Sequence, residues 1–89
     1  MNDIAYLSND GEYTIFTYED KTIKFLTSKN LERYMSVLEW DKGYLVVMSK
    51  NYGKEAEENY IDLVPILENL LIDVEKFLSP IKEVQIRYD

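Results

Sequence analysis

Apolar and polar residues alternate along much of the chain before residue 62, which is the pattern of strands with one buried face. Short runs of this kind cover residues 4–8, 12–18 and 22–26. Between the first two runs lie Asp10 and Gly11, and an Asp-Gly pair favours a hairpin turn because glycine adopts positive φ at little cost. These segments predict the start of an antiparallel meander.

The segment 31–40 fits two periodicities. Its apolar residues have the spacing of a short helix, but alternate residues from Tyr34 to Trp40 also fall on one side of a strand. The residues that follow resemble a three-residue hairpin loop, with a type I turn at Asp41 and Lys42 and with Gly43 in the left-handed position. This favours a strand, although Gly43 would equally end a helix.

The segment 44–48 is apolar on both alternating sets, which predicts a central strand buried on two faces. A turn is predicted at 51–54, where Gly53 stands among polar residues. The segment 57–61 then reads as the returning strand, polar at first and apolar afterwards.

A helical pattern runs from residue 63 to residue 78. Its apolar positions form one continuous stripe at helical period. They are Leu63, Ile66, Leu67, Leu70, Leu71, Val74, Phe77 and Leu78. Asp62 is a suitable N-cap, Pro65 falls in the first turn, and Pro80 marks the end. Alternatively, Asp73 caps a second short helix after a break at Ile72.

The order of these elements predicts one α+β domain over residues 1–89. We expect an antiparallel β-meander of about six to seven short strands packed against one long C-terminal amphipathic helix. Val84, Ile86 and Tyr88 alternate with polar residues and predict a final strand that closes the fold.

Composition removes most catalytic chemistry, because the chain contains no histidine and no cysteine. It therefore lacks an imidazole that carries protons near neutral pH, a thiolate nucleophile and the usual ligands of a zinc site. No glycine-rich phosphate loop and no calcium-loop spacing is present. We expect a protein that is not an enzyme and that has no cofactor and no metal.

The net charge of the chain limits the classes of partner that it is expected to bind. Ten basic residues stand against 17 acidic ones, which gives a formal charge of −7. Such a field repels phosphate backbones and anionic lipid headgroups, so we expect no direct nucleic-acid partner and no membrane partner. The first residues lack the basic and apolar regions of a signal peptide, and a cytoplasmic location is expected.

Eight tyrosines point to an interaction surface, since tyrosine is enriched at interfaces, although it also suits half-buried strand positions. A sheet of six or seven strands is roughly 25–30 Å wide, whereas one helix is about 10 Å across. One helix therefore leaves apolar sheet surface uncovered, unless the sheet coils around it. The residues expected to bind a partner there are Phe16, Tyr18, Tyr34, Trp40 and Tyr44.

Two functions follow from these patterns. The first is a small non-catalytic intracellular protein-binding or regulatory module that associates with itself through an aromatic sheet face, a homodimer being the economical arrangement. The alternative is an acidic mimic of nucleic acid that inhibits a DNA- or RNA-binding protein, similar in size and charge to phage inhibitors and antitoxins. Its acidic face would contain Glu57, Glu58, Glu68 and Asp73.

Overall fold

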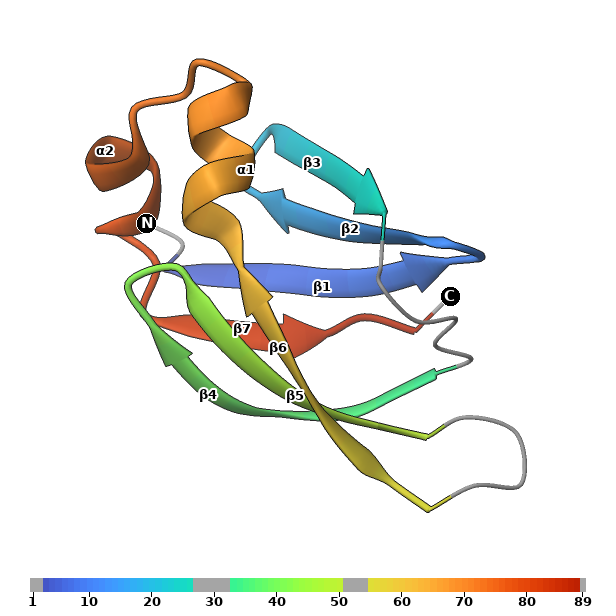
Figure 1. The fold of residues 1–89 in the computed structure, drawn as a ribbon. Helices are drawn as coiled ribbons and strands as arrows, with labels where there is room; N and C mark the ends of the chain where they lie inside the picture. The colour runs from blue at the N-terminus through green and yellow to red at the C-terminus, as the bar shows by residue number, and fades with distance from the viewer. Residues whose placement is uncertain (1–2, 27–32, 51–54, 89) are drawn as a thin grey trace.

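The computed structural model describes residues 3–26, 33–50 and 55–88, which form strands in two sheets and two short helices (Figure 1). The strands are β1 (Ile4–Asp10), β2 (Tyr13–Tyr18), β3 (Lys21–Leu26), β4 (Arg33–Asp41), β5 (Tyr44–Lys50), β6 (Glu57–Asp62) and β7 (Glu83–Ile86). The helices are α1 (Leu63–Asn69) and α2 (Val74–Leu78).

The first sheet has the order β3-β2-β1-β7. Strands β1, β2 and β3 are antiparallel neighbours, as the sequence predicts, and Gly11 adopts a φ of 63° in the turn between β1 and β2. Strand β7 pairs with β1 in parallel, with Val84 opposite Ala5. This pairing brings the last strand of the chain beside the first.

The second sheet has the antiparallel order β4-β5-β6. The strand interpretation of the segment 31–40 is therefore correct from residue 33 onward, while residues 31–32 and the predicted turn at 51–54 lie outside the described residues. Strand β4 lies beside β7 without a shared ladder, so the two sheets meet along these strands (Figure 1).

The core fills the space between the two sheets and under the helices. The first sheet contributes Leu7 and Phe16, the second contributes Leu45, and α1 contributes Leu63, all of them fully buried. Each strand supplies this core from every second residue, because successive side chains point to opposite faces.

The prediction of an α+β fold with one long C-terminal helix is wrong, since the described chain is mostly β and the helical stripe is divided into α1 and α2. The break lies at Leu70 and Leu71, and Leu71 adopts a φ of 59° with its side chain 93% exposed. Asp73 then caps α2 by accepting a hydrogen bond from the backbone N–H of Lys76. The alternative of a second short helix capped by Asp73 is confirmed.

Packing explains the break. A straight helix over the whole stripe would be about 24 Å long. The turn at Leu71 instead returns the chain, so that Phe77 and Leu78 of α2 enter the same core as Leu63 and Leu67 of α1. The predicted single meander is also wrong, because this helical connection crosses between the sheets and lays β7 parallel to β1.

In the turn between β4 and β5, Gly43 is buried against the two helices, while Lys42 is exposed. Lys42 and Gly43 form a two-residue loop with φ values of 48° and 101°, rather than the predicted three-residue loop. The carbonyl of Gly43 accepts a hydrogen bond of 2.9 Å from the N–H of Leu63. Asp62 accepts a bond from the N–H of Val64 at 3.0 Å, which confirms it as the N-cap of α1.

Candidate functional site

The five aromatic residues predicted to bind a partner do not share one exposed face. Phe16 and Tyr18 lie on the inner side of β2 and are buried, with 0% and 7% of their surface exposed. Trp40 is half-buried, and its ring stacks on Phe16 at 5.8 Å between centroids. Tyr44 is 58% exposed, while the side chain of Tyr34 lies outside the described residues.

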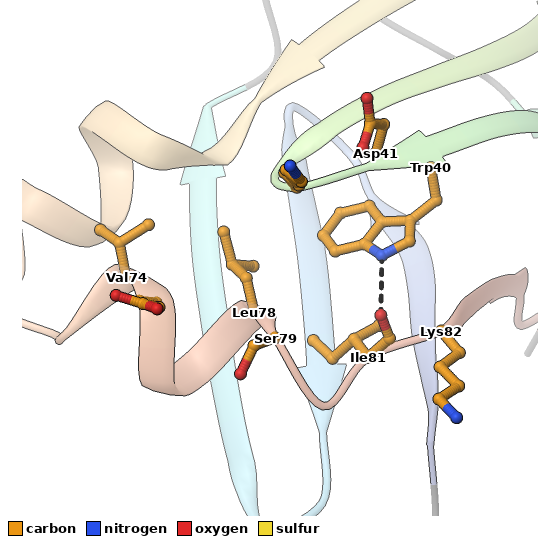
Figure 2. A pocket seen from close by; sticks show the side chains of 9 residues that line it. Trp40, Asp41, Val74, Leu78, Ser79, Ile81 and Lys82 are labelled. Carbon is orange, nitrogen blue, oxygen red and sulfur yellow. Dashed lines mark hydrogen bonds between the residues drawn. The ribbon is translucent and has the colours of Figure 1, made fainter.

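A groove opens between the β4–β5 turn and α2 (Figure 2). Its volume is about 740 Å³, and the indole N–H of Trp40 donates a 3.0 Å hydrogen bond to the carbonyl of Ile81 beside it. The groove is lined by Trp40, Asp41, Lys42, Val74, Glu75, Leu78, Ser79, Ile81 and Lys82. A groove with apolar side chains and charges of both signs around them can hold an apolar side chain.

Sequence reasoning missed this groove, because one of its walls is a helix that the continuous stripe does not predict. The signal that was available is Asp73, whose capping of α2 places Val74 and Leu78 opposite Trp40. Trp40 is the single tryptophan of the chain, so fluorescence excited selectively at tryptophan reports on this groove and on the adjoining core around Phe16.

The second sheet carries exposed aromatic residues on the side turned away from the core. Leu45 and Val47 of β5 point inward, so the alternate residues Tyr44, Val46 and Met48 point outward. The prediction that β5 is buried on both faces is therefore wrong. On β6, Tyr60 lies directly opposite Val46 and is 72% exposed. We call Tyr44, Val46, Met48 and Tyr60 the outer aromatic face.

Acidic side chains lie beside the outer aromatic face on both strands that flank β5. Glu39 and Asp41 of β4 and Glu58 and Asp62 of β6 lie opposite residues of this face, whereas Glu57 lies opposite the inward-pointing Ser49. Glu39 lies opposite Val46, and Glu58 lies opposite Met48. Glu58 also accepts a 3.2 Å hydrogen bond from the hydroxyl of Tyr60. The described part of this face therefore has tyrosines and apolar side chains at its centre and carboxylates on the two flanking strands.

The carboxylates next to Tyr60 raise the pKa of its phenol. The hydrogen bond to Glu58 raises the pKa of Tyr60 above its ordinary value of 10.0, and the negative charges of Glu58 and Glu39 act in the same direction. In the core, burial raises the pKa of Tyr18, with a further contribution from the negative charge of Glu19. Both phenols therefore keep their protons in the folded state at a pH where the unfolded chain has begun to lose them.

Stability is expected to fall at alkaline pH for this reason. A group whose pKa is raised by folding contributes its stabilisation below its unfolded value, here 10.0, and loses it as the pH rises through the folded value. Urea unfolding of the wild type at increasing pH is expected to show this decline from about pH 10 upward. The double variant Tyr18→Phe, Tyr60→Phe is expected to show a shallower decline. An identical decline in both proteins would contradict the assignment.

The four carboxylates of the predicted acidic face lie on three separate elements. Glu57 and Glu58 are neighbours in β6, so their side chains point to opposite sides of the strand. Glu68 is exposed on α1, and the carboxylate of Asp73 caps α2. Glu57 and Glu58 therefore do not share one face of the sheet. Within the described residues, no group of three or more acids lies close enough together to hold a metal ion.

The fold and its surface define a small two-sheet β domain with an exposed acidic and aromatic sheet face. The chain belongs to the family described as Domain of unknown function (DUF7724), whose model matches residues 3–89. Comparison with curated proteins and with solved structures gives no significant match. Neither of the helices formed by the described residues is long and apolar enough to cross a membrane.

Proposed function

We propose that this chain is a small protein-binding module without catalytic activity of its own, and that the outer aromatic face is its docking surface. The observation that supports this proposal is the pair of exposed tyrosines next to the half-buried Val46, with Tyr44 two residues before it on β5 and Tyr60 opposite it on β6. Tyrosine supplies a large contact area with few rotatable bonds, and one end of its ring remains polar.

Charge favours a basic partner over a second copy for this face. A symmetric dimer through the outer aromatic face would bring Glu39 and Glu58 of one protomer close to the same residues of the other, and like charges at close range repel. A lysine or arginine from a partner would instead lie between these carboxylates and over the tyrosine rings, where cation–π attraction adds to ionic attraction. The proposed partner is therefore a protein with an exposed basic segment.

Selection from a random-peptide library displayed on phage, with the whole chain immobilised, tests the proposal. Selected peptides are expected to be rich in lysine and arginine, and their binding is expected to fall at least about tenfold in the variant Tyr44→Ser, Tyr60→Ser. Tyr88→Ser is the matched control, because Tyr88 is also exposed, at 56%, but lies beyond β7 and outside the outer aromatic face.

Three outcomes would overturn the proposal. One is a selection that yields no enriched peptide, and another is binding that Tyr44→Ser, Tyr60→Ser leaves intact. The third is light scattering that finds a dimer of the wild type which the double variant abolishes, because a second copy would then occupy the face. Binding of the selected peptides is also expected to weaken with added salt, as ionic contacts at an exposed surface do.

A further inference from the structure

Strand β6 forms an edge of the second sheet, with β5 on one side and no strand of the described chain on the other (Figure 1). The N–H of Leu63, which follows β6, donates to Gly43 beside β5. In an antiparallel ladder, the backbone groups of every second residue point to the same side. The alternation therefore directs the N–H and C=O groups of Ile61 and Asn59 toward β5, and those of Tyr60 and Glu58 toward the open edge.

The open edge coincides with one border of the outer aromatic face. Tyr60 and Glu58 present their side chains on this face and their backbone groups at the edge. A strand laid along β6 would therefore pair with the backbone of these residues and place its own side chains beside the tyrosine ring and the carboxylate. On the other side of β5, the carboxylate of Glu39 also belongs to the surroundings of Tyr60, and its negative charge contributes to the raised pKa of Tyr60.

We propose that the open edge of β6 accepts an extended basic segment of the partner protein as a fourth, antiparallel strand of the second sheet. This inference rests on the proposed function and specifies how the partner is held. Glu57 and Glu58 give the edge its negative charge, and edge strands that carry charge of one sign discourage pairing with identical strands. The same charge attracts a strand that carries lysine or arginine.

Alternation decides which residues of the added strand meet which surface. Residues directly opposite Glu58 and Tyr60 share the outer aromatic face with them, and these positions suit lysine or arginine. The residue between them points to the other side, toward Asn59 and the buried Ile61, and suits an apolar side chain. The expected partner segment therefore alternates basic and apolar residues.

A second copy of the chain could itself offer a basic edge strand. Strand β3 is the edge of the first sheet, and its charged residues are Lys21 and Lys24. Pairing of β3 with β6 of another copy would be head-to-tail and would build a ring or an open filament. Lys24 already lies over the ring of Tyr13, with 4.5 Å between Nζ and the ring centroid, and Lys21 lies 5.7 Å from that of Phe77. A separate basic partner is therefore the favoured occupant.

The test uses a synthetic peptide of six alternating lysine and valine residues, the length of β6, with blocked ends. In the proposed antiparallel ladder, the lysine amides opposite Glu58 and Tyr60 bond to β6, whereas the valine amides point away. N-methylation of the lysine amides is expected to weaken binding to the whole chain by at least about tenfold, because it removes several hydrogen bonds. N-methylation of the valine amides is the matched control and is expected to leave binding unchanged.

Hydrogen exchange provides a second measurement. The unmodified peptide is expected to slow exchange of the Glu58 and Tyr60 amides, which point to the open edge. Equal binding of the two N-methylated peptides would overturn the edge inference while leaving the proposed function intact, because the peptide would then lie on the face without backbone pairing. No binding by the lysine–valine peptide, with basic peptides still selected from the library, would have the same meaning.

Occupation by a second copy is tested separately. Light scattering would overturn the inference if it showed oligomers that grow with protein concentration and that are absent in the variant Lys21→Glu, Lys24→Glu. Strand β3 of a second copy would then be the occupant of the edge. A chain that remains monomeric while it binds the lysine–valine peptide supports it.

Discussion

Replacement of Phe16 with alanine is expected to lower the free energy of unfolding by about 3–5 kcal/mol. Phe16 has no exposed surface, and its ring lies 5.8 Å from Trp40 and 6.3 Å from Phe77 between centroids. The side chain thus joins the second sheet and α2 to the first sheet. Since small domains are stable by only about 5–15 kcal/mol, the loss is a large share of the total. Urea unfolding followed by circular dichroism measures it.

Tyr13→Ala is the matched control, because Tyr13 lies on the same strand but is 40% exposed and points away from the core. Its loss removes a contact with Lys24 and is expected to cost about 1 kcal/mol or less. If Phe16→Ala left stability unchanged and instead reduced peptide binding, Phe16 would belong to a docking surface and the core described above would be wrong.

Gly43→Ala is expected to destabilise the chain by about 2–5 kcal/mol. The left-handed backbone contributes about 1–2 kcal/mol, because Gly43 has a φ of 101° and a Cβ crowds the backbone there. An added Cβ would also lie 2.9 Å from Cδ1 of Leu78 and 3.0 Å from Cγ2 of Val64. Crowding of this kind in a packed core costs about 1–3 kcal/mol.

Gly11→Ala is the control for the crowding of Leu78 and Val64 by an added Cβ. Gly11 also has a positive φ, of 63°, but a Cβ there would meet nothing within 4 Å. Its replacement is expected to cost only the backbone term of about 1–2 kcal/mol. Equal melting temperatures for the two variants would show that Leu78 and Val64 move aside without loss, and that the β4–β5 turn is not held tightly against the helices.

Local patterns predicted the elements whose cause is local. Alternation gave β1, β2 and β3, and the Asp-Gly pair gave the turn between the first two. Asp62 was found as a helix cap because its role depends on the next residues alone. Gly43 was placed correctly in the left-handed region, although the loop has two residues rather than three.

Features that depend on distant contacts could not be predicted in this way. The spacing of Leu70 and Leu71 fits a continuous helix, and only the position of the core shows why the helix ends before them. Both sides of β2 carry large residues, so alternation alone does not decide that Phe16 points inward and Tyr13 outward. The parallel pairing of β7 with β1 joins segments at opposite ends of the chain, and no local pattern records it.

The residues of the candidate site also differ in whether a local pattern predicts them. Tyr44 was identified from the sequence and lies on the outer aromatic face, whereas Tyr60 was not singled out. The importance of Tyr60 comes from the register that places it opposite Val46, and the prediction of 57–61 as the returning strand did not include a register. Trp40 was expected on a partner-binding face, and it instead lies half-buried at the groove beside α2.

The pairing of β7 with β1 also governs when this protein can fold. The ladder joins Ile4 to Glu83, so its second strand leaves the ribosome well after its first. Until Glu83–Ile86 emerges, β1 has a partner on one side only, and the sheets lack the strand that lies between β1 and β4. During translation, the hairpin of β1 and β2 therefore has an unpaired edge along β1. Contacts between residues so distant in sequence make folding slow relative to helical domains of similar size.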